Sequence, residues 1–230
     1  MKPVVVLNNL RALQEKIIRC RKCPRLVRYL AEIKNKFPTY WCRPVPAFGD
    51  PNAKILLIGL APGRFGSNRT GRMFTGDASG NFLFPVLYEA GLASKPDVTS
   101  LHDGLKLKNA FITAVTRCAP PQNKPRPEEI ANCRSYLEEE LAQLSRLHVV
   151  VALGKIAHDE YLRIRLEEEK RRLRDFPFRH GAVYRFEREP IILIDTYHPS
   201  RQNTNTGKLT RRMFQEIFKQ ALGLAASGPT

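Results

Sequence analysis

Two sets of side chains in this sequence are of types that carry chemistry. Four of the five cysteines form a pattern, with two residues between Cys20 and Cys23 and fourteen between Cys118 and Cys133. A CxxC turn places two thiolates for one metal centre. The second set contains Asp77, at the end of a glycine-rich loop, and His198. A carboxylate can steady a developing cation or position a water, and an imidazole can donate to a leaving-group oxygen.

The cysteine spacing leaves the metal open. Four thiolates suit either zinc or an iron–sulfur cluster. Cys118 and Cys133 lack the second CxxC of a zinc ribbon, and this absence favours a cluster. The alternative is that both are small buried hydrophobic residues and that the CxxC is a bare turn. Cys42, which stands apart from the pattern, is predicted to lie in the core.

The loop that ends at Asp77 covers residues 59–77 and contains five glycines between two apolar segments, which indicates close approach of backbone to a ligand. It has neither a P-loop motif nor Gly-x-Gly-x-x-Gly, which disfavours nucleoside triphosphates and dinucleotides. No Gly-x-Ser-x-Gly elbow occurs, which disfavours acyl hydrolysis. Ser200 and Arg201, which follow His198 closely, can hold a phosphate.

The elements that must position these residues follow from hydrophobic spacing. Short apolar segments predict strands, and helical patterns lie between them. Alternating strands and helices predict one α/β domain over residues 1–230, an open three-layer α/β/α fold around a four-stranded parallel sheet flanked by helices. The predicted strands are residues 55–60, 110–115, 148–153 and 191–196. The predicted helices are residues 81–90, 127–144, 155–174 and 208–224, after an N-terminal helix and CxxC turn over about 7–33 and before a frayed tail over about 225–230.

The unusual residues all follow the carboxyl ends of the predicted strands. They lie in four loops, residues 59–63, 116–123, 154–158 and 197–204. Open parallel sheets bind ligands at that edge. We therefore expect the four loops to converge on one site.

The charge of the chain points to a polyanionic partner. Lys and Arg number 38 against 22 Asp and Glu, a formal net charge of +16. Such a surplus favours nucleic acid through counterion release. The apolar segments are too short to span a bilayer, and the first residues do not have the pattern of a signal peptide. We expect a cytoplasmic protein that does not bind membranes.

The motifs in these loops resemble those of the uracil-DNA glycosylase superfamily, and within it the family 5, or type B, enzymes. Gly59-Leu-Ala-Pro-Gly63, with the segment from Asn68 to Asp77, is similar to the first motif of that family. His198-Pro-Ser-Arg-Gln-Asn-Thr204 is similar to the second. The four patterned cysteines fall where related iron–sulfur glycosylases place their cluster ligands. The resemblance covers the chain from about Cys20 to Thr204.

The resemblance implies a monomeric DNA repair enzyme that flips a damaged base out of DNA and hydrolyses its N-glycosidic bond, leaving an abasic site. The expected partner is double-stranded DNA, with single-stranded DNA as a second candidate. Asp77 is assigned to the sugar and the water, His198 to the base oxygen, and Asn123 to the base or the water. Phe74 matches the aromatic residue on which the flipped base stacks. The implied base-binding residues are Gly59, Leu60, Ala61, Pro62, Gly63, Phe74 and Ala114. The implied DNA contacts are Asn68, Arg69, Ser200, Arg201 and Gln202, and a structural [4Fe-4S] cluster is implied on Cys20, Cys23, Cys118 and Cys133.

Two departures from the wider superfamily bear on specificity. Other families have an Asp, Glu or Asn where this chain has Leu60, which can do no proton chemistry. They also have a uracil-reading Asn where this chain has Ala114. We hypothesise that Asp77 acts instead and that base selection is relaxed, with hypoxanthine and modified pyrimidines as substrates beside uracil.

Two alternatives come from other functional classes. The chain could be a non-catalytic iron–sulfur or zinc protein that binds nucleic acid, with Leu60 and Ala114 marking lost activity. A small-molecule hydrolase on the same sheet is the second, and it predicts turnover of free nucleosides and weak salt dependence of binding.

Overall fold

The computed structural model describes residues 3–166, 171–187 and 190–227. Its centre is one six-stranded sheet in the order β1-β3-β2-β4-β6-β5. The four inner strands are β3 (Ala110–Ala114), β2 (Ile55–Gly59), β4 (Val149–Leu153) and β6 (Ile192–Thr196), and they run parallel. All residues of these strands are buried, as expected for a parallel sheet covered on both faces.

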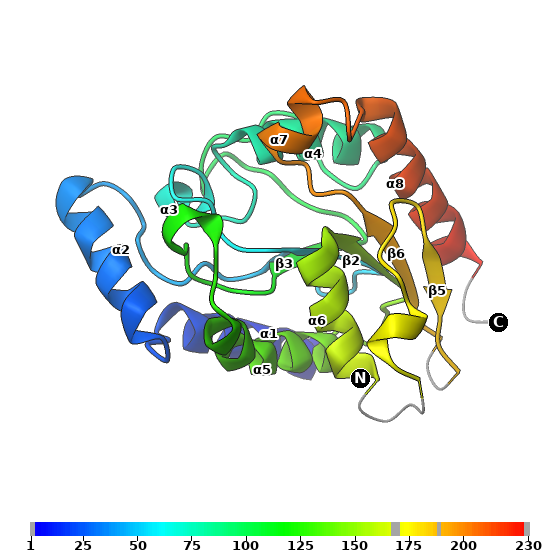
Figure 1. Cartoon of the computed structure of the whole chain (residues 1–230), viewed down its shortest axis with the longest axis horizontal. Helices are drawn as coiled ribbons and strands as arrows, with labels where there is room; N and C mark the ends of the chain where they lie inside the picture. The colour runs from blue at the N-terminus through cyan, green and yellow to red at the C-terminus, as the bar shows by residue number, and fades with distance from the viewer. Residues whose placement is uncertain (1–2, 167–170, 188–189, 228–230) are drawn as a thin grey trace.

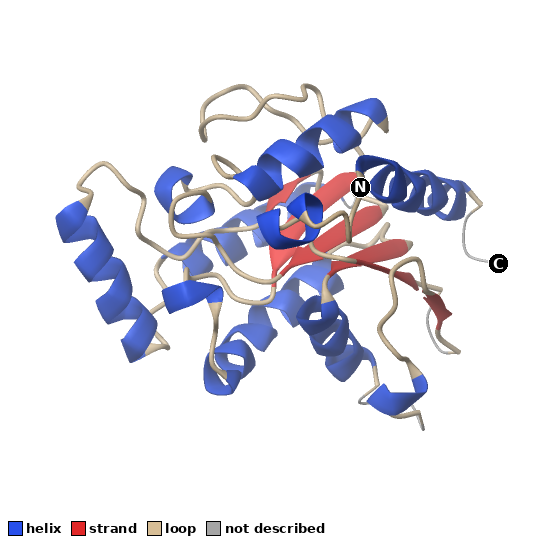
Figure 2. Ribbon diagram, turned by 45° about the horizontal axis from the view of Figure 1, so that its top comes forward, coloured by secondary structure: helices blue, strands red, loops and turns tan. Residues whose placement is uncertain are grey.

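Helices cover both faces of the sheet and form a three-layer α/β/α arrangement (Figures 1 and 2). On one face, α4 (Ala78–Glu89) and α8 (Arg211–Ala226) pack against the strands in one apolar core. The other face carries α1 (Pro3–Ile18), α5 (Pro127–Gln143) and α6 (Lys155–Arg165). The remaining helical elements are α2 (Pro24–Lys36), α3 (Ser67–Thr70), α7 (Arg201–Asn205) and two 3-10 turns, η1 (Pro121–Asn123) and η2 (Leu173–Asp175).

The four parallel strands predicted from the sequence are confirmed, but the sheet has two further strands at its edges. These are β1 (Phe48–Gly49) and β5 (Val183–Arg185), each antiparallel to its neighbour. Strands of two and three residues are too short for a hydrophobic alternation to be recognised in the sequence. They cover the outer edges of the parallel strands, which would otherwise expose unpaired backbone groups.

The prediction of one helix over residues 155–174 is wrong. Helix α6 ends at Arg165, and the 3-10 turn η2 begins at Leu173, with Arg172 as its N-cap. Residues 167–170 lie outside the described part of the chain. The charged residues of this segment satisfy helix propensity, but Phe176 turns the chain back into the core, where it is buried under the sheet.

The prediction of a frayed tail that begins at about residue 225 is wrong at its first residues. Helix α8 continues to Ala226, and Ala225 is buried in the core rather than frayed. Residues 228–230 lie outside the described chain. In the part of the chain that the structure describes, no helix is long and apolar enough to cross a membrane.

The predicted N-terminal helix and CxxC turn are present, a second helix follows the turn, and together they extend beyond the predicted bounds of 7–33. Leu13 and Ile17 on α1 pack against Tyr136 and Cys133 on α5. Helix α2 begins with Pro24 in its first turn, directly after Cys23, a position in which the missing N–H of proline costs nothing. In Figure 1, α2 stands at one end of the molecule, beside α3.

Candidate functional site

A large pocket of about 1160 Å³ opens at the carboxyl ends of the parallel strands. Three of the four predicted loops line it, those that follow β2, β3 and β6. This is the edge at which open α/β sheets bind ligands. The lining residues are Tyr29, Gly59, Leu60, Ala61, Gly63, Arg64, Phe65, Gly66, Ser67, Met73, Phe74, Gly76, Asp77, Ala78, Ser79, Ala114, Pro120, Pro121, Gln122, Asn123, His198, Ser200, Arg201 and Gln202.

Asp77 is fixed at the N-terminus of α4. Its Oδ1 atom accepts hydrogen bonds from the backbone N–H groups of Ser79 (3.0 Å) and Gly80 (3.2 Å), so it is the N-cap of that helix. Burial raises the pKa of Asp77 above its ordinary value. The two backbone donors and the positive charges of Arg201 and Arg69 oppose this rise. The carboxylate is thus held rigidly, in surroundings that make it more basic than an exposed aspartate.

His198 follows β6 and lines the same pocket, although it lies far from Asp77 in the sequence. The Asn203 side-chain amide on α7 donates to the His198 carbonyl (2.8 Å) and fixes this turn. Burial lowers the pKa of His198 to about 4. The imidazole is therefore neutral at neutral pH, with one N–H available to donate.

Phe74 forms part of the pocket wall beside His198. The two rings stack with centroids 5.9 Å apart and an interplanar angle of 29°. Phe74 has a left-handed backbone (φ 54°), and its N–H donates to the buried Ser67 hydroxyl (2.9 Å). Its ring lies against Gly59, where a Cβ atom would come within 2.8 Å of the Phe74 Cζ. The Phe74 ring can occupy this position because residue 59 has no side chain.

Asn123 lines the same pocket but is exposed. It lies at the end of turn η1, and it and Gln122 both have left-handed backbones (φ 57° and 56°). Asn and Gln side chains can donate and accept hydrogen bonds, so this turn offers polar groups at the rim. Its role toward a base or water stays a prediction.

The predicted base-binding residues lie in the pocket wall with one exception. Pro62 is buried and does not line the pocket. Leu60 and Ala114 line it and present only apolar atoms. The pocket wall at these two positions therefore has no side-chain group for proton transfer or for reading a base edge.

Two of the predicted DNA contacts, Asn68 and Arg69, do not line the pocket. Asn68 is fully buried, and its amide donates to the Arg64 carbonyl (3.4 Å) and the Cys42 sulfur (3.6 Å). Arg69 donates to the carbonyls of Phe65 (2.8 Å) and Gly76 (3.1 Å). Both side chains bond to carbonyls within the loop, whose backbone acceptors need partners. Ser200, Arg201 and Gln202 do line the pocket.

The fourth predicted loop does not reach this pocket. Residues 154–157 line a neighbouring cavity of about 470 Å³ that shares Leu60 and His198 with the main pocket. His158 is buried, with its Nδ1 bonded to Asp195 Oδ1 (2.8 Å) and its Nε2 to the Phe176 carbonyl (2.8 Å). This histidine fastens α6 to β6 instead of facing a ligand.

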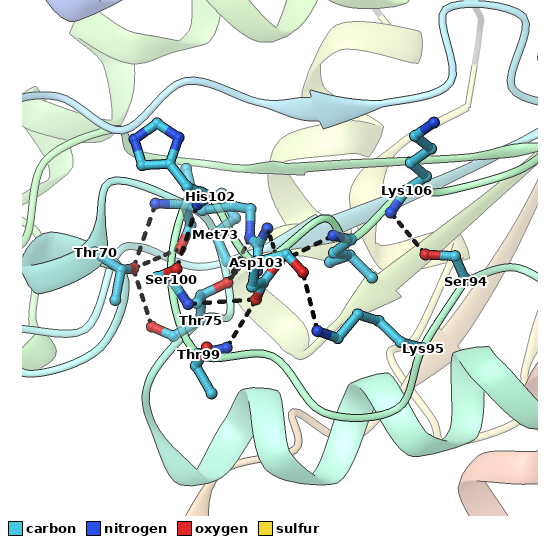
Figure 3. A network of polar contacts seen from close by, with 12 residues as sticks. Thr70, Met73, Thr75, Ser94, Lys95, Thr99, Ser100, His102, Asp103 and Lys106 are labelled. Carbon is cyan, nitrogen blue, oxygen red and sulfur yellow. Dashed lines mark hydrogen bonds and ion pairs between the residues drawn. The ribbon is translucent and has the colours of Figure 1, made fainter.

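An ion pair that the sequence did not signal holds the glycine-rich loop in place. Arg72 donates two hydrogen bonds to Asp103, at 2.9 and 2.6 Å, and both side chains are 5% exposed. Asp103 also accepts from the backbone of Thr99 (2.8 Å) and Leu105 (3.0 Å), and Figure 3 shows Thr99 beside Asp103. Burial acts to raise the pKa of Asp103, but Arg72 and the backbone donors hold it well below its ordinary value. The loop of residues 94–106 is thus pinned against the pocket loop.

The four patterned cysteines lie together and line one small cavity of about 10 Å³, with Arg117 and Asn132.

The surroundings of these cysteines are those of a buried thiol group. The Asn132 amide donates to the Cys23 sulfur (3.6 Å). Burial raises the pKa of the Cys118 thiol, and the three neighbouring thiols raise it further. Among the described residues, no three His, Cys, Asp or Glu side chains are grouped so that they could hold a single metal ion. Cys42 lies apart from this group and is half-buried rather than in the core.

The pocket wall also contains residues that were not predicted from the sequence. Tyr29 on α2 lines the pocket, and so do Arg64 and Phe65 in the glycine-rich loop. Phe65 is 55% exposed. An aromatic residue between glycines in a loop without a hydrophobic period was the available signal, because such a residue has no core position to fill.

Comparison with known proteins agrees with this geometry. Residues 46–222 match the family model described as "Uracil DNA glycosylase superfamily". The chain is 53% identical over 211 residues to the type-5 uracil-DNA glycosylase of Thermus thermophilus, with 90% of this chain and 94% of that protein covered. It is 41% identical to the type-5 uracil-DNA glycosylase of Pyrobaculum aerophilum, with coverage of 90% and 89%. A type-4 uracil-DNA glycosylase of Sulfurisphaera tokodaii is 27% identical, with coverage of 95% and 86%. The chain belongs to the uracil-DNA glycosylase superfamily, among its type-5 members.

Proposed function

We propose that this chain is a uracil-DNA glycosylase that hydrolyses the bond between uracil and deoxyribose in DNA and leaves an abasic site. The observation that carries the proposal is that Asp77 and His198, a carboxylate and a neutral imidazole, line one pocket from different parts of the chain. The names of the type-5 relatives support the same activity. A base inside a duplex cannot reach such a pocket, so the nucleotide must be flipped out.

Departure of the base separates charge, and each end of the bond needs its own partner. As the C1′–N bond breaks, the sugar becomes cationic and the base anionic. Asp77 faces the sugar, stabilises its positive charge and takes a proton from the water whose oxygen bonds to C1′. Its Oδ1 is occupied by two backbone donors, whereas no hydrogen bond to Oδ2 is found among the described residues. Oδ2 is therefore the atom that receives the proton.

His198 acts on the leaving base. Because burial lowers its pKa to about 4, it is a neutral donor at neutral pH. Its N–H donates to a base oxygen and stabilises the negative charge that develops there. The departing base is released as an anion and takes a proton from solvent.

Base recognition rests on stacking and shape. Phe74 supplies the aromatic surface, and Gly59, Ala61 and Ala114 leave room beside it. Since Leu60 and Ala114 offer no hydrogen bond, the pocket does not select uracil by a side-chain amide at these positions. We propose that hypoxanthine and modified pyrimidines are also accepted, with Asn123 or the backbone making the polar contacts.

The DNA partner follows from charge. The net charge of +16 favours a polyanion, and Ser200, Arg201 and Gln202 lie at the pocket where the phosphates beside a flipped nucleotide would pass. We propose that the protein acts as a monomer, on double-stranded and on single-stranded DNA.

We further propose that Cys20, Cys23, Cys118 and Cys133 hold a structural [4Fe-4S] cluster. The support is the donor set, four thiols around one cavity that joins the α1–α2 turn, the exit of β3 and helix α5. Four cysteine thiolates are the usual ligands of a [4Fe-4S] cluster. When bound, the cluster supplies a cross-link between these three segments.

The test uses duplexes with one uracil, one hypoxanthine or only normal bases, followed by alkali to cleave abasic sites. Scission at uracil that is lost in Asp77→Asn establishes the activity, and scission at hypoxanthine establishes the relaxed selection. Salt-sensitive binding without scission at any base favours instead a non-catalytic nucleic-acid-binding protein.

A further inference from the structure

An exposed aromatic cluster borders the mouth of the pocket. It consists of Phe37, Tyr40 and Phe65, with Arg64 between them. Phe65 is the most exposed of the large hydrophobic residues in the described chain, at 55%, and it lines the pocket. A large apolar side chain left open beside a ligand pocket marks a contact surface.

The side chains of this cluster hold one another through ring–ring and cation–ring contacts. Phe37 stacks on Tyr40 with centroids 4.7 Å apart and an angle of 17°, and it meets Phe65 edge-on at 6.3 Å and 88°. The Arg64 guanidinium lies 4.8 Å from the Phe65 ring centroid and 5.9 Å from that of Phe37. These cation–π contacts hold the Phe65 ring while more than half of the side chain stays open.

Backbone contacts join the two segments that carry the cluster. The N–H groups of Trp41 and Cys42 donate to the carbonyls of Arg69 and Asn68 on α3, at 3.0 and 3.1 Å. The end of α2 is thereby fastened to the glycine-rich loop, in agreement with the positions of α2 and α3 in Figure 1. The ring of Phe65 is presented on a fixed support.

The charges around the cluster specify its partner. Lys34 and Lys36 lie in the last turn of α2, and Arg64 lies within the cluster. The buried Nε of Arg64 has no hydrogen-bond partner among the described residues. An aromatic ring surrounded by cations suits a flat base attached to a phosphate, the combination used for single-stranded nucleic acid.

We propose that Phe65 stacks on an unpaired base next to the flipped nucleotide in the same DNA strand. The proposal rests on the proposed function. Phe74 and Phe65 belong to one loop and line one pocket, so a strand that delivers one base to Phe74 passes its neighbour by Phe65. The protein therefore binds uracil best where the adjacent base is already unpaired, in single strands or bubbles.

The experiment places 2-aminopurine, whose fluorescence falls on stacking, beside a uracil in a single-stranded oligonucleotide. Binding and single-turnover excision are measured for the wild type, Phe65→Ala, Phe65→Leu and Phe65→Trp. Tyr88→Ala is the matched control, since Tyr88 is 49% exposed and does not line the pocket. We expect Phe65→Ala and Phe65→Leu to weaken binding about tenfold and to abolish the quenching, with the excision rate at saturation unchanged. Phe65→Trp and Tyr88→Ala should resemble the wild type.

Equal binding and equal quenching in Phe65→Ala and the wild type overturn the proposal. Since Phe65→Leu keeps apolar bulk, loss of binding in Phe65→Ala but not in Phe65→Leu also overturns it, because stacking is then not the cause. Failure of the proposed function is separate: the wild type then excises no base, while quenching still reports whether Phe65 stacks.

Discussion

The Oδ2 atom of Asp77 lies 1.9 Å from the position that a Cβ atom on Gly66 would occupy. Real Cβ atoms do not approach an oxygen so closely, so no side chain can stand at residue 66 while Asp77 keeps its place. The Asp77 carboxylate cannot move aside cheaply, because its Oδ1 caps α4. The glycine at the start of α3 is therefore part of what sets the position of the carboxylate.

Gly66→Ala should displace Asp77 and reduce excision. A misplacement of about 1 Å in a catalytic group can lower the rate about 100-fold. Single-turnover excision of uracil measures the effect. Gly223→Ala is the control, since a Cβ there meets nothing within 4 Å and an alanine in helix α8 should raise stability by about 0.5–1 kcal/mol. A Gly66→Ala rate equal to that of the wild type would show that Asp77 is not held by this contact.

Asp77→Asn should abolish most activity without unfolding the protein. Asparagine is as good an N-cap as aspartate, so α4 keeps its cap while the group that accepts the proton is lost. We expect the excision rate to fall by about 10²–10⁴-fold, with the thermal midpoint and the affinity for DNA nearly unchanged. Retained excision in a folded Asp77→Asn protein would assign the water activation to another group.

The pH dependence of excision follows from the shifted pKa values of Asp77 and His198. The raised pKa of Asp77 means that its ionised, active form is gained as pH rises through a value above that of an ordinary aspartate. His198 titrates near pH 4 and is neutral above it. We expect the single-turnover rate to rise on the acid side and to stay flat between about pH 6 and 8. A decline through about pH 6.5 would indicate that a protonated histidine is required instead.

Asp103→Asn should destabilise the protein. It leaves Arg72 buried without its counter-ion, which costs about 3 kcal/mol. Asp159→Asn breaks the exposed pair with Lys155 and should cost less than about 0.5 kcal/mol. Because the folded-state pKa of Asp103 is depressed, its stabilisation is present above the unfolded pKa and is lost as pH falls toward the folded value. Urea unfolding should show a difference between wild type and Asp103→Asn that is largest at pH 7 and smaller, but still present, at pH 3, which lies below the unfolded pKa and above the folded one.

The sequence predicted the parallel strands and most of the pocket because both depend on local patterns. A buried strand such as Ile55–Gly59 is a continuous apolar run, and the residues after it must lie at the sheet edge. The loop 59–77 was recognisable by its glycines, and Asp77 by its isolated charge. These features need no knowledge of distant contacts.

What the sequence did not predict depends on such contacts. Asn68 is polar, as surface residues usually are, but a tight turn buries it against Cys42. The pairing of Arg72 with Asp103 spans 31 residues and leaves no periodic signal. The end of α6 at Arg165 is set by the return of Phe176 to the core rather than by a breaking residue. In each case tertiary packing overrides local propensity.

The cysteine group gives the last prediction. Its members come from the α1–α2 turn, the exit of β3 and helix α5. A metal centre bound there would therefore cross-link the α1–α2 turn to two segments that are distant from it in the sequence. It would also stabilise the folded state, because the unfolded chain does not preform the site. Anaerobically purified protein should contain about four iron and four sulfide per chain. Cys133→Ser should lose the iron and lower the thermal midpoint, whereas Cys42→Ser, outside the group, should keep the iron. A content of one zinc per chain would show that the site binds zinc and not a cluster. A metal-free protein of unchanged stability would show that these cysteines are ordinary core residues.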